Sequence, residues 1–169
     1  MRLISNHYIN DKYLSVANDL ITDAEGFTAY WYNDIFGNKT IGYGFKASGY
    51  AKNYLSQYLL NPNELMTIQE AKTILEYIIT DINNELANSV KLFDALLSNN
   101  KKAVLIDMAY NLGMAQFMTF DTFLSYLKAG RIDDAVCDLT NTLWYNQVKN
   151  RAIRDCLNLY AQDINYYLL

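Results

Sequence analysis

Three residues near the start of the chain, Glu25, Asp34 and Thr40, have side chains and a spacing that could do chemistry together. They form the pattern E-x8-D-x5-T, which supplies two carboxylates and a hydroxyl within sixteen residues. Cleavage of a glycosidic bond by water needs one carboxylic acid for the leaving oxygen and one carboxylate to activate the water. The pattern therefore predicts Glu25 as general acid, Asp34 as general base and Thr40 as the hydroxyl that positions the water.

Each of these residues also has an ordinary explanation when it is taken alone. Glu25 could be an exposed glutamate at a helix end, and Asp34 a turn aspartate that bonds its own backbone. Thr40 could be present for its β-propensity. The joint spacing at a junction between helix and hairpin favours the catalytic interpretation, because the negative end of a helix suits a residue that must carry a proton.

Two glycines, Gly42 and Gly44, follow Thr40 at alternate positions of an expected strand. Glycine weakens a strand, so a pair on one face indicates that something approaches the backbone closely. A sugar ring would fit, and we predict both glycines as substrate contacts. Local twist or a β-bulge is the alternative.

The elements around this pattern follow from the spacing of apolar residues. A helix is expected over about residues 6–24, with Gly26 as its C-terminal stop. Residues 27–32 are extended in character, 33–38 are rich in turn formers, and 39–45 alternate as one strand. Glu25 is therefore expected at a helix end, with Asp34 in the turn of a β-hairpin.

The rest of the chain reads as helix. Thr67 and Glu70 form a capping box before the best-defined helix, which runs to about Leu86. The segment 101–112 is apolar on nearly all sides, as in the buried centre of a bundle, and Gly113 would end it. Three shorter helices are expected over 121–129, 133–143 and 150–160.

These elements predict an α+β fold that is mostly helical. We expect a single domain over 1–169, with a hairpin lobe containing a small antiparallel sheet over about 1–66 and a bridging helix over about 67–88. A larger all-helical lobe would occupy about 89–169, and the N-terminal helix would pack on it. Ligand sites favour the cleft between such lobes.

Composition excludes several classes of function. The chain has 169 residues, of which 51% are hydrophobic, and a net charge of −4 without any basic block, so nucleic acid is not an expected partner. His7 is the only histidine, and no zinc, phosphate-loop or G-x-S-x-G spacing is present, so no cofactor or metal is expected. The sequence begins without the apolar core of a signal peptide and has no run of membrane-spanning length.

Cys137 and Cys156 are the two cysteines, both in expected helices. Two cysteines are too few for a disulfide framework. We expect buried thiols in a reducing cytoplasm.

Motifs along most of the chain resemble one known family. The segment from Thr40 to Gly44 (TIGYG), the segment from Tyr110 to Gly113 (YNLG), and the downstream Trp144–Gln147 (WYNQ) with Asn150–Ala152 (NRA) occur in the right order. With the E-x8-D-x5-T spacing, they resemble the phage-type lysozymes, family 24 of the glycoside hydrolases. Phe45 stands where many relatives carry a histidine, and the acidic balance contrasts with basic relatives.

The resemblance implies a lysozyme-like fold and an endolysin that hydrolyses the β-1,4 bond between N-acetylmuramic acid and N-acetylglucosamine in peptidoglycan, with inversion. It implies that Tyr110, Asn111 and Asp138 contact sugar and that Trp144 packs in the core. The enzyme would be a monomer that stays in the bacterial cytoplasm until a separate holin-type protein releases it to the wall in the periplasm. Peptidoglycan strands would be its partner, without stable membrane insertion.

Two alternatives remain open at this point. A lytic transglycosylase uses the sugar's own hydroxyl in place of water, and has less need of Asp34 and Thr40. A non-catalytic wall-binding module or a structural component of the virion could keep the same fold without activity.

Overall fold

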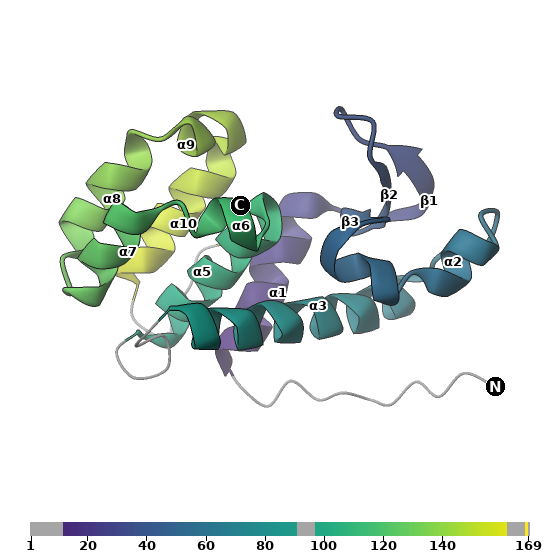
Figure 1. Ribbon diagram of the computed structural model, residues 1–169, viewed down its shortest axis with the longest axis horizontal. Coiled ribbons are helices and arrows are strands. Elements are labelled where there is room, and N and C mark those ends of the chain that lie inside the picture. The colour runs from purple at the N-terminus through teal and green to yellow at the C-terminus, as the bar shows by residue number, and fades with distance from the viewer. Residues whose placement is uncertain (1–11, 91–96, 162–167, 169) are drawn as a thin grey trace.

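The computed structural model describes residues 12–90, 97–161 and 168. Figure 1 shows a small lobe with a sheet and a larger helical lobe, joined along one side by a long helix. The fold is α+β and mostly helical, with a three-stranded antiparallel sheet in the order β1-β2-β3, which confirms the predicted fold class. No helix within the described ranges is both long and apolar enough to cross a membrane.

Helix α1 (Lys12–Glu25) lies against the helical lobe, where it packs on α5. Its apolar residues recur every three or four positions, and six of them are buried, which explains why this amphipathic segment is helical. Gly26 has a φ of 65°, so the chain turns out of the helix directly after Glu25. The part of the predicted helix that precedes Lys12 lies outside the described residues, as does His7.

The small lobe contains β1 (Thr28–Asn33), β2 (Lys39–Gly42) and β3 (Phe45–Lys46). The 3₁₀-helix η1 (Gly49–Asn53) and α2 (Ser56–Leu60) follow, in a segment whose sequence gave no clear expectation. Strands β1 and β2 pair with Tyr32 opposite Thr40, and the register shifts between Thr28 and Tyr32. The hairpin between β1 and β2 is as predicted.

The single strand predicted over residues 39–45 was wrong. Strand β2 ends at Gly42, and the chain reverses through Tyr43 and Gly44 into β3. Gly42 and Gly44 have φ values of 68° and 79°, in the left-handed region that side chains rarely adopt. The two glycines therefore form a tight turn instead of one face of a longer strand.

Helix α3 (Ile68–Ser89) joins the lobes, and its start is the predicted capping box. The Thr67 hydroxyl accepts from the backbone N–H of Glu70, and the Glu70 carboxylate accepts from the backbone N–H of Thr67. Such a cap contributes about 1 kcal/mol to helix stability. Buried isoleucines and leucines along α3 connect the core of the two lobes.

The helical lobe surrounds α5 (Asn99–Leu112), which is buried from Lys102 to Ala109, as the apolar pattern predicted. Five further helices follow in chain order: α6 (Met114–Phe117), α7 (Asp121–Lys128), α8 (Ile132–Thr140), α9 (Leu143–Val148) and α10 (Asn150–Tyr160). Gly113 ends α5 with a φ of 79°, and α10 has the predicted bounds.

Two expectations about this lobe were wrong. The helix predicted over 133–143 ends at Thr140, because Thr142 caps a new helix by accepting from the backbone N–H of Tyr145. Both cysteines are free thiols, but only Cys156 is buried, whereas Cys137 is exposed. Cys137 lies on the outer side of the short amphipathic helix α8, where only Ala135 and Leu139 are buried.

Candidate active site

Glu25 is the last residue of α1 and lies between the two lobes. Its Oε1 accepts a hydrogen bond of 2.6 Å from Nη1 of Arg151, which comes from α10. Its Oε2 faces Gly44: a Cβ added at Gly44 would lie 2.8 Å from that oxygen. The carboxyl group is therefore held from the helical lobe on one side and lies against bare backbone of the small lobe on the other.

Arg151 is itself fixed by a buried aspartate. Its Nε and Nη2 donate to the two carboxylate oxygens of Asp107, each over 2.9 Å, and Asp107 also accepts from Arg154 over 2.8 Å. Burial opposes the charge on Asp107, but the two guanidinium groups outweigh it and lower its pKa. Burial and the nearby charge of Asp107 raise the pKa of Asp155, whose Oδ1 accepts from Arg154 over 2.9 Å.

Asp34 opens the turn between β1 and β2, and groups of that same turn hold it. Its Oδ1 accepts from the backbone N–H groups of Phe36 (2.9 Å) and Asn38 (2.8 Å), and its Oδ2 accepts from the Asn38 side-chain amide (2.8 Å). The Asn38 amide is the largest cause that lowers the pKa of Asp34, and Lys46, at 3.9 Å, adds to it. This is the environment of an ionised carboxylate, as a general base requires.

Thr40 is connected to Asp34 through Asn38. The Thr40 hydroxyl donates to the backbone carbonyl of Asn38 over 2.9 Å, and the residue is only 2% exposed. Its proton is thus committed to the protein, which leaves the oxygen lone pairs to accept from another group. Asn38 therefore fixes both Asp34 and Thr40.

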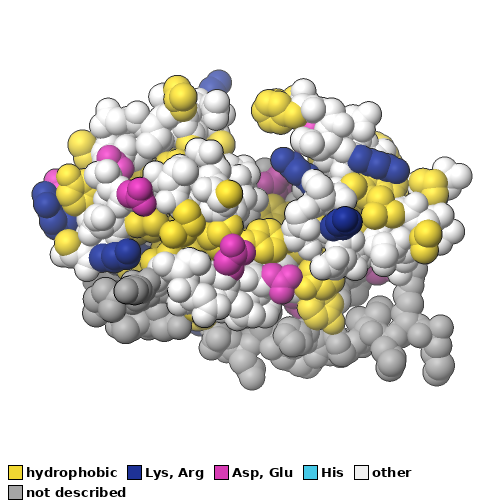
Figure 2. All heavy atoms as spheres, viewed as in Figure 1, with side chains coloured by type: hydrophobic (Ala, Val, Ile, Leu, Met, Phe, Trp, Pro, Cys, Tyr) yellow, Lys and Arg dark blue, Asp and Glu magenta, His cyan; other side chains and the backbone are white. Residues whose placement is uncertain are grey.

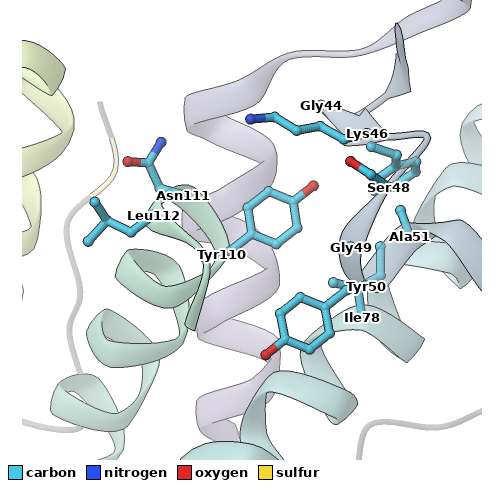
Figure 3. A pocket seen from close by; sticks show the side chains of 12 residues that line it. Gly44, Lys46, Ser48, Gly49, Tyr50, Ala51, Ile78, Tyr110, Asn111 and Leu112 are labelled. Atoms are coloured by element: carbon cyan, nitrogen blue, oxygen red, sulfur yellow. The ribbon is translucent and has the colours of Figure 1, made fainter. Parts of the chain in front are cut away.

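A cavity of about 180 Å³ lies between the lobes beside Gly44. Lys46, Tyr50 and Ile78 line it together with Tyr110 and Asn111 on α5, as Figure 3 shows. A wider groove of about 720 Å³ continues from it along η1 and α6, and shares Gly49, Tyr50, Leu112 and Gly113 with it. Figure 2 shows the space between the lobes as a notch in the molecular surface. The hollow is thus elongated, as an extended chain molecule requires.

Residues 22–158 match the phage lysozyme family. The chain belongs to this family. The matched segment contains all of the predicted site residues, from Glu25 to Asp138. A curated relative, the pre-baseplate central spike protein Gp5 of Enterobacteria phage T4, is 26% identical over 109 residues. That match covers 63% of this chain and 19% of the spike protein, so the chain spans only a small part of that relative's length.

The residues of this phage lysozyme family member that were predicted to contact substrate lie in different parts of the structure. Tyr110 and Asn111 line the cavity beside Gly44. The Tyr110 hydroxyl donates to the backbone carbonyl of Tyr43 over 2.6 Å, and the Asn111 carbonyl oxygen accepts from Nε1 of Trp144 over 2.9 Å. Tyr110 thereby connects the two lobes, and burial, followed by the charge of Glu25, raises its pKa well above the usual value.

Two other predicted contacts are not in that cavity. Asp138 lines a separate hollow of about 490 Å³ on the helical lobe, with Asp121, Leu112 and Trp144. A Cβ at Gly42 would lie 2.5 Å from the ring of Phe45 and 2.9 Å from the sulfur of Met66, so packing inside the small lobe explains this glycine. Only Gly44 lies against the predicted acid. Trp144 is buried in the core, as predicted.

Sequence reasoning missed the residues that hold the acid, above all Arg151 and Asp107. A signal was present, because Asp107 stands in the middle of a segment that is apolar on nearly all sides. A buried carboxylate needs a partner. Arg151 and Arg154, three residues apart and thus on one helix face, were candidates for that partner.

Proposed function

We propose that the protein is an endolysin-type muramidase that hydrolyses the β-1,4 bond between N-acetylmuramic acid and N-acetylglucosamine in bacterial peptidoglycan. The observation that carries the proposal is that two carboxyl groups with different environments each lie beside a residue lining the interlobe cavity, Glu25 beside Gly44 and Asp34 3.9 Å from Lys46. Glu25 is half-buried against backbone and Asp34 is kept ionised by its turn. Family membership supports the same substrate class.

In this mechanism Glu25 donates a proton to the leaving glycosidic oxygen. Arg151 fixes the Glu25 carboxyl group by one hydrogen bond. Two other donor groups of Arg151 bond to Asp107, so most of the positive charge of the guanidinium that orients Glu25 is already paired with Asp107. The open backbone at Gly44 lets a glycosidic oxygen come close to that carboxyl group.

On the other side Asp34 removes a proton from the attacking water as the bond to the anomeric carbon forms. The lone pairs of Thr40 accept a hydrogen bond from the same water, which orients it beside Asp34. An attack from the face opposite the leaving group inverts the anomeric carbon. Glu25 then needs a proton from solvent, and Asp34 must lose one, before the next cycle.

Product analysis tests this proposal. Purified murein is incubated with the protein, and new chain ends are identified by mass spectrometry and by the NMR signal of the anomeric proton. We expect reducing N-acetylmuramic acid ends, initially as the α-anomer. Anhydro-muramic ends would instead identify a lytic transglycosylase, and β-anomers would exclude inversion.

Release from the host is the finer part of the proposal: the enzyme would act on the wall in the periplasm after a holin-type protein opens the inner membrane. This proposal would be supported if cells that express the protein lyse only when a holin is co-expressed. The similarity to a phage spike protein favours a second candidate, a lysozyme module within the virion. Protein that remains bound to purified phage particles would support the second candidate.

A further inference from the structure

Tyr32 lies beside two of the predicted catalytic residues, Asp34 and Thr40, although no motif points to it. It is on β1, directly opposite Thr40 in the antiparallel register, so the two side chains share one face of the sheet at a Cβ separation of about 5 Å. Asp34 follows two residues later in the chain. Tyr32 is 39% exposed, so its ring borders the solvent-filled side of the site.

The phenol of Tyr32 interacts electrostatically with both carboxylates. Burial raises the pKa of Tyr32, and the negative charges of Glu25 and Asp34 raise it further. Tyr32 in turn contributes to the raised pKa of Tyr110, which belongs to the other lobe. The Tyr32 phenol is therefore coupled electrostatically to both carboxylates and to Tyr110, and it keeps its proton.

Its hydroxyl differs from those of three other tyrosines in this region, Tyr50, Tyr54 and Tyr110. Tyr50 donates to Glu85, Tyr54 to Asp81 and Tyr110 to the carbonyl of Tyr43, so each of these protons is committed to the protein. Within the described part of the chain, the Tyr32 hydroxyl has no hydrogen-bond partner. A protonated phenol with an available donor, beside two carboxylates, is suited to bind a neutral oxygen acceptor.

We propose that Tyr32 is a further substrate-contacting residue, whose hydroxyl donates a hydrogen bond to a hydroxyl or amide oxygen of the sugar held between Glu25 and Asp34. The role rests on the muramidase function proposed above. Saccharides carry many such neutral oxygens, whereas an anionic ligand group would be repelled by the two carboxylates. The bond fixes the ring so that its anomeric carbon stays in line with the water at Asp34.

The test removes only the hydroxyl, in Tyr32→Phe. We expect kcat/KM on purified murein to fall about tenfold, which corresponds to the loss of one hydrogen bond. Tyr160→Phe is the matched control, because it also removes a phenol hydroxyl that is next to a carboxylate, that of Asp133, but on the helical lobe away from the hollow. This control should keep wild-type activity, and both variants should keep the wild-type melting temperature.

A binding measurement separates this proposal from the proposed function. A soluble murein tetrasaccharide is titrated by calorimetry into Glu25→Gln and into Glu25→Gln/Tyr32→Phe. About tenfold weaker binding by the double variant supports the contact even if wild-type protein releases no reducing ends, in which case only the muramidase proposal fails. Activity and affinity within twofold of the parent proteins would overturn the role of Tyr32, and so would absence of tetrasaccharide binding by both variants.

Discussion

Glu25 and Asp34 each lie next to a residue that lines the interlobe cavity, Gly44 and Lys46 respectively, but their partners lie at very different distances along the chain. Within the described residues, every hydrogen bond to the Asp34 carboxylate comes from within four residues, in its own turn. The hydrogen bond to Glu25 comes from Arg151, 126 residues away, and Arg151 depends on the buried Asp107. The proposed base is thus held by local structure, whereas the orientation of the proposed acid depends on tertiary packing.

The largest expected effect is on the acid itself. Glu25→Gln keeps a side-chain oxygen that can accept from Arg151 but removes the proton donor, so hydrolysis of murein should fall about a thousandfold or more. Release of reducing ends measures the rate, and circular dichroism should show unchanged helix content. A variant that keeps a tenth of the activity would reject Glu25 as the acid.

The buried cluster should control stability more than any group of the hairpin. Asp107→Ala leaves Arg151 and Arg154 buried without their shared partner, which should cost about 3–5 kcal/mol of unfolding free energy. Denaturant titration measures it. Asp34→Asn is the contrasting variant: it should lose activity yet unfold near the wild-type midpoint, because its hydrogen bonds come from one turn and its ion pair with Lys46 is partly exposed. Equal destabilisation of the two variants would contradict the comparison.

Two glycine-to-alanine variants separate the effect of contact with Glu25 from the effect of backbone strain. Gly44 and Gly130 have φ values of 79° and 70°, so alanine at either position should cost about 1–2 kcal/mol. Only at Gly44 does the added Cβ meet Glu25, whereas it meets nothing within 4 Å at Gly130, which follows α7 on the helical lobe.

We therefore expect Gly44→Ala to lower kcat about tenfold to a hundredfold, as expected for a displaced catalytic group. Gly130→Ala should keep kcat near wild type at a similar loss of stability. Equal kcat values in the two variants would show that the space beside Glu25 has no role in turnover.

The smallest effect concerns the pH dependence of the base. The pKa of Asp34 is lowered in the folded protein, so its carboxyl group stays ionised to a more acidic pH than that of an ordinary aspartate. Its action as a base is lost as the pH falls through that lowered pKa. Asn38→Ala removes the side-chain hydrogen bond that lowers the pKa of Asp34 most, so the acid limb of the pH–rate profile should move to higher pH. Carboxyl ¹³C NMR of Asp34 should show the same direction, and an unmoved limb would remove Asp34 as the group that controls it.

The same contrast explains how much could be predicted from the sequence. The capping box at Thr67, the buried helix around Asp107 and the hairpin turn at Asp34 depend on residues within one or two turns of chain, and all were predicted. The reversal at Gly42 and Gly44 was missed because their positive φ values reflect packing against Phe45 and Glu25. Periodicity along the sequence carries no information about such contacts.

The candidate site divides in a similar way. Glu25, Asp34 and Thr40 were predicted from their spacing, and Gly44 was predicted to allow a close approach by a sugar, whereas the group beside it in the structure is the Glu25 carboxyl group. Arg151 was not assigned a role, because only the packing of α10 against α5 brings it to Glu25.

The dependence of Glu25 on α10 also has a consequence for how activity arises during synthesis. A fragment that ends before Arg151 contains all three residues of the E-x8-D-x5-T pattern, but nothing in it anchors the proton donor. Ribosome-bound intermediates should therefore be harmless to murein. Cutting ability would appear only after translation has passed the last long helix and that helix has docked.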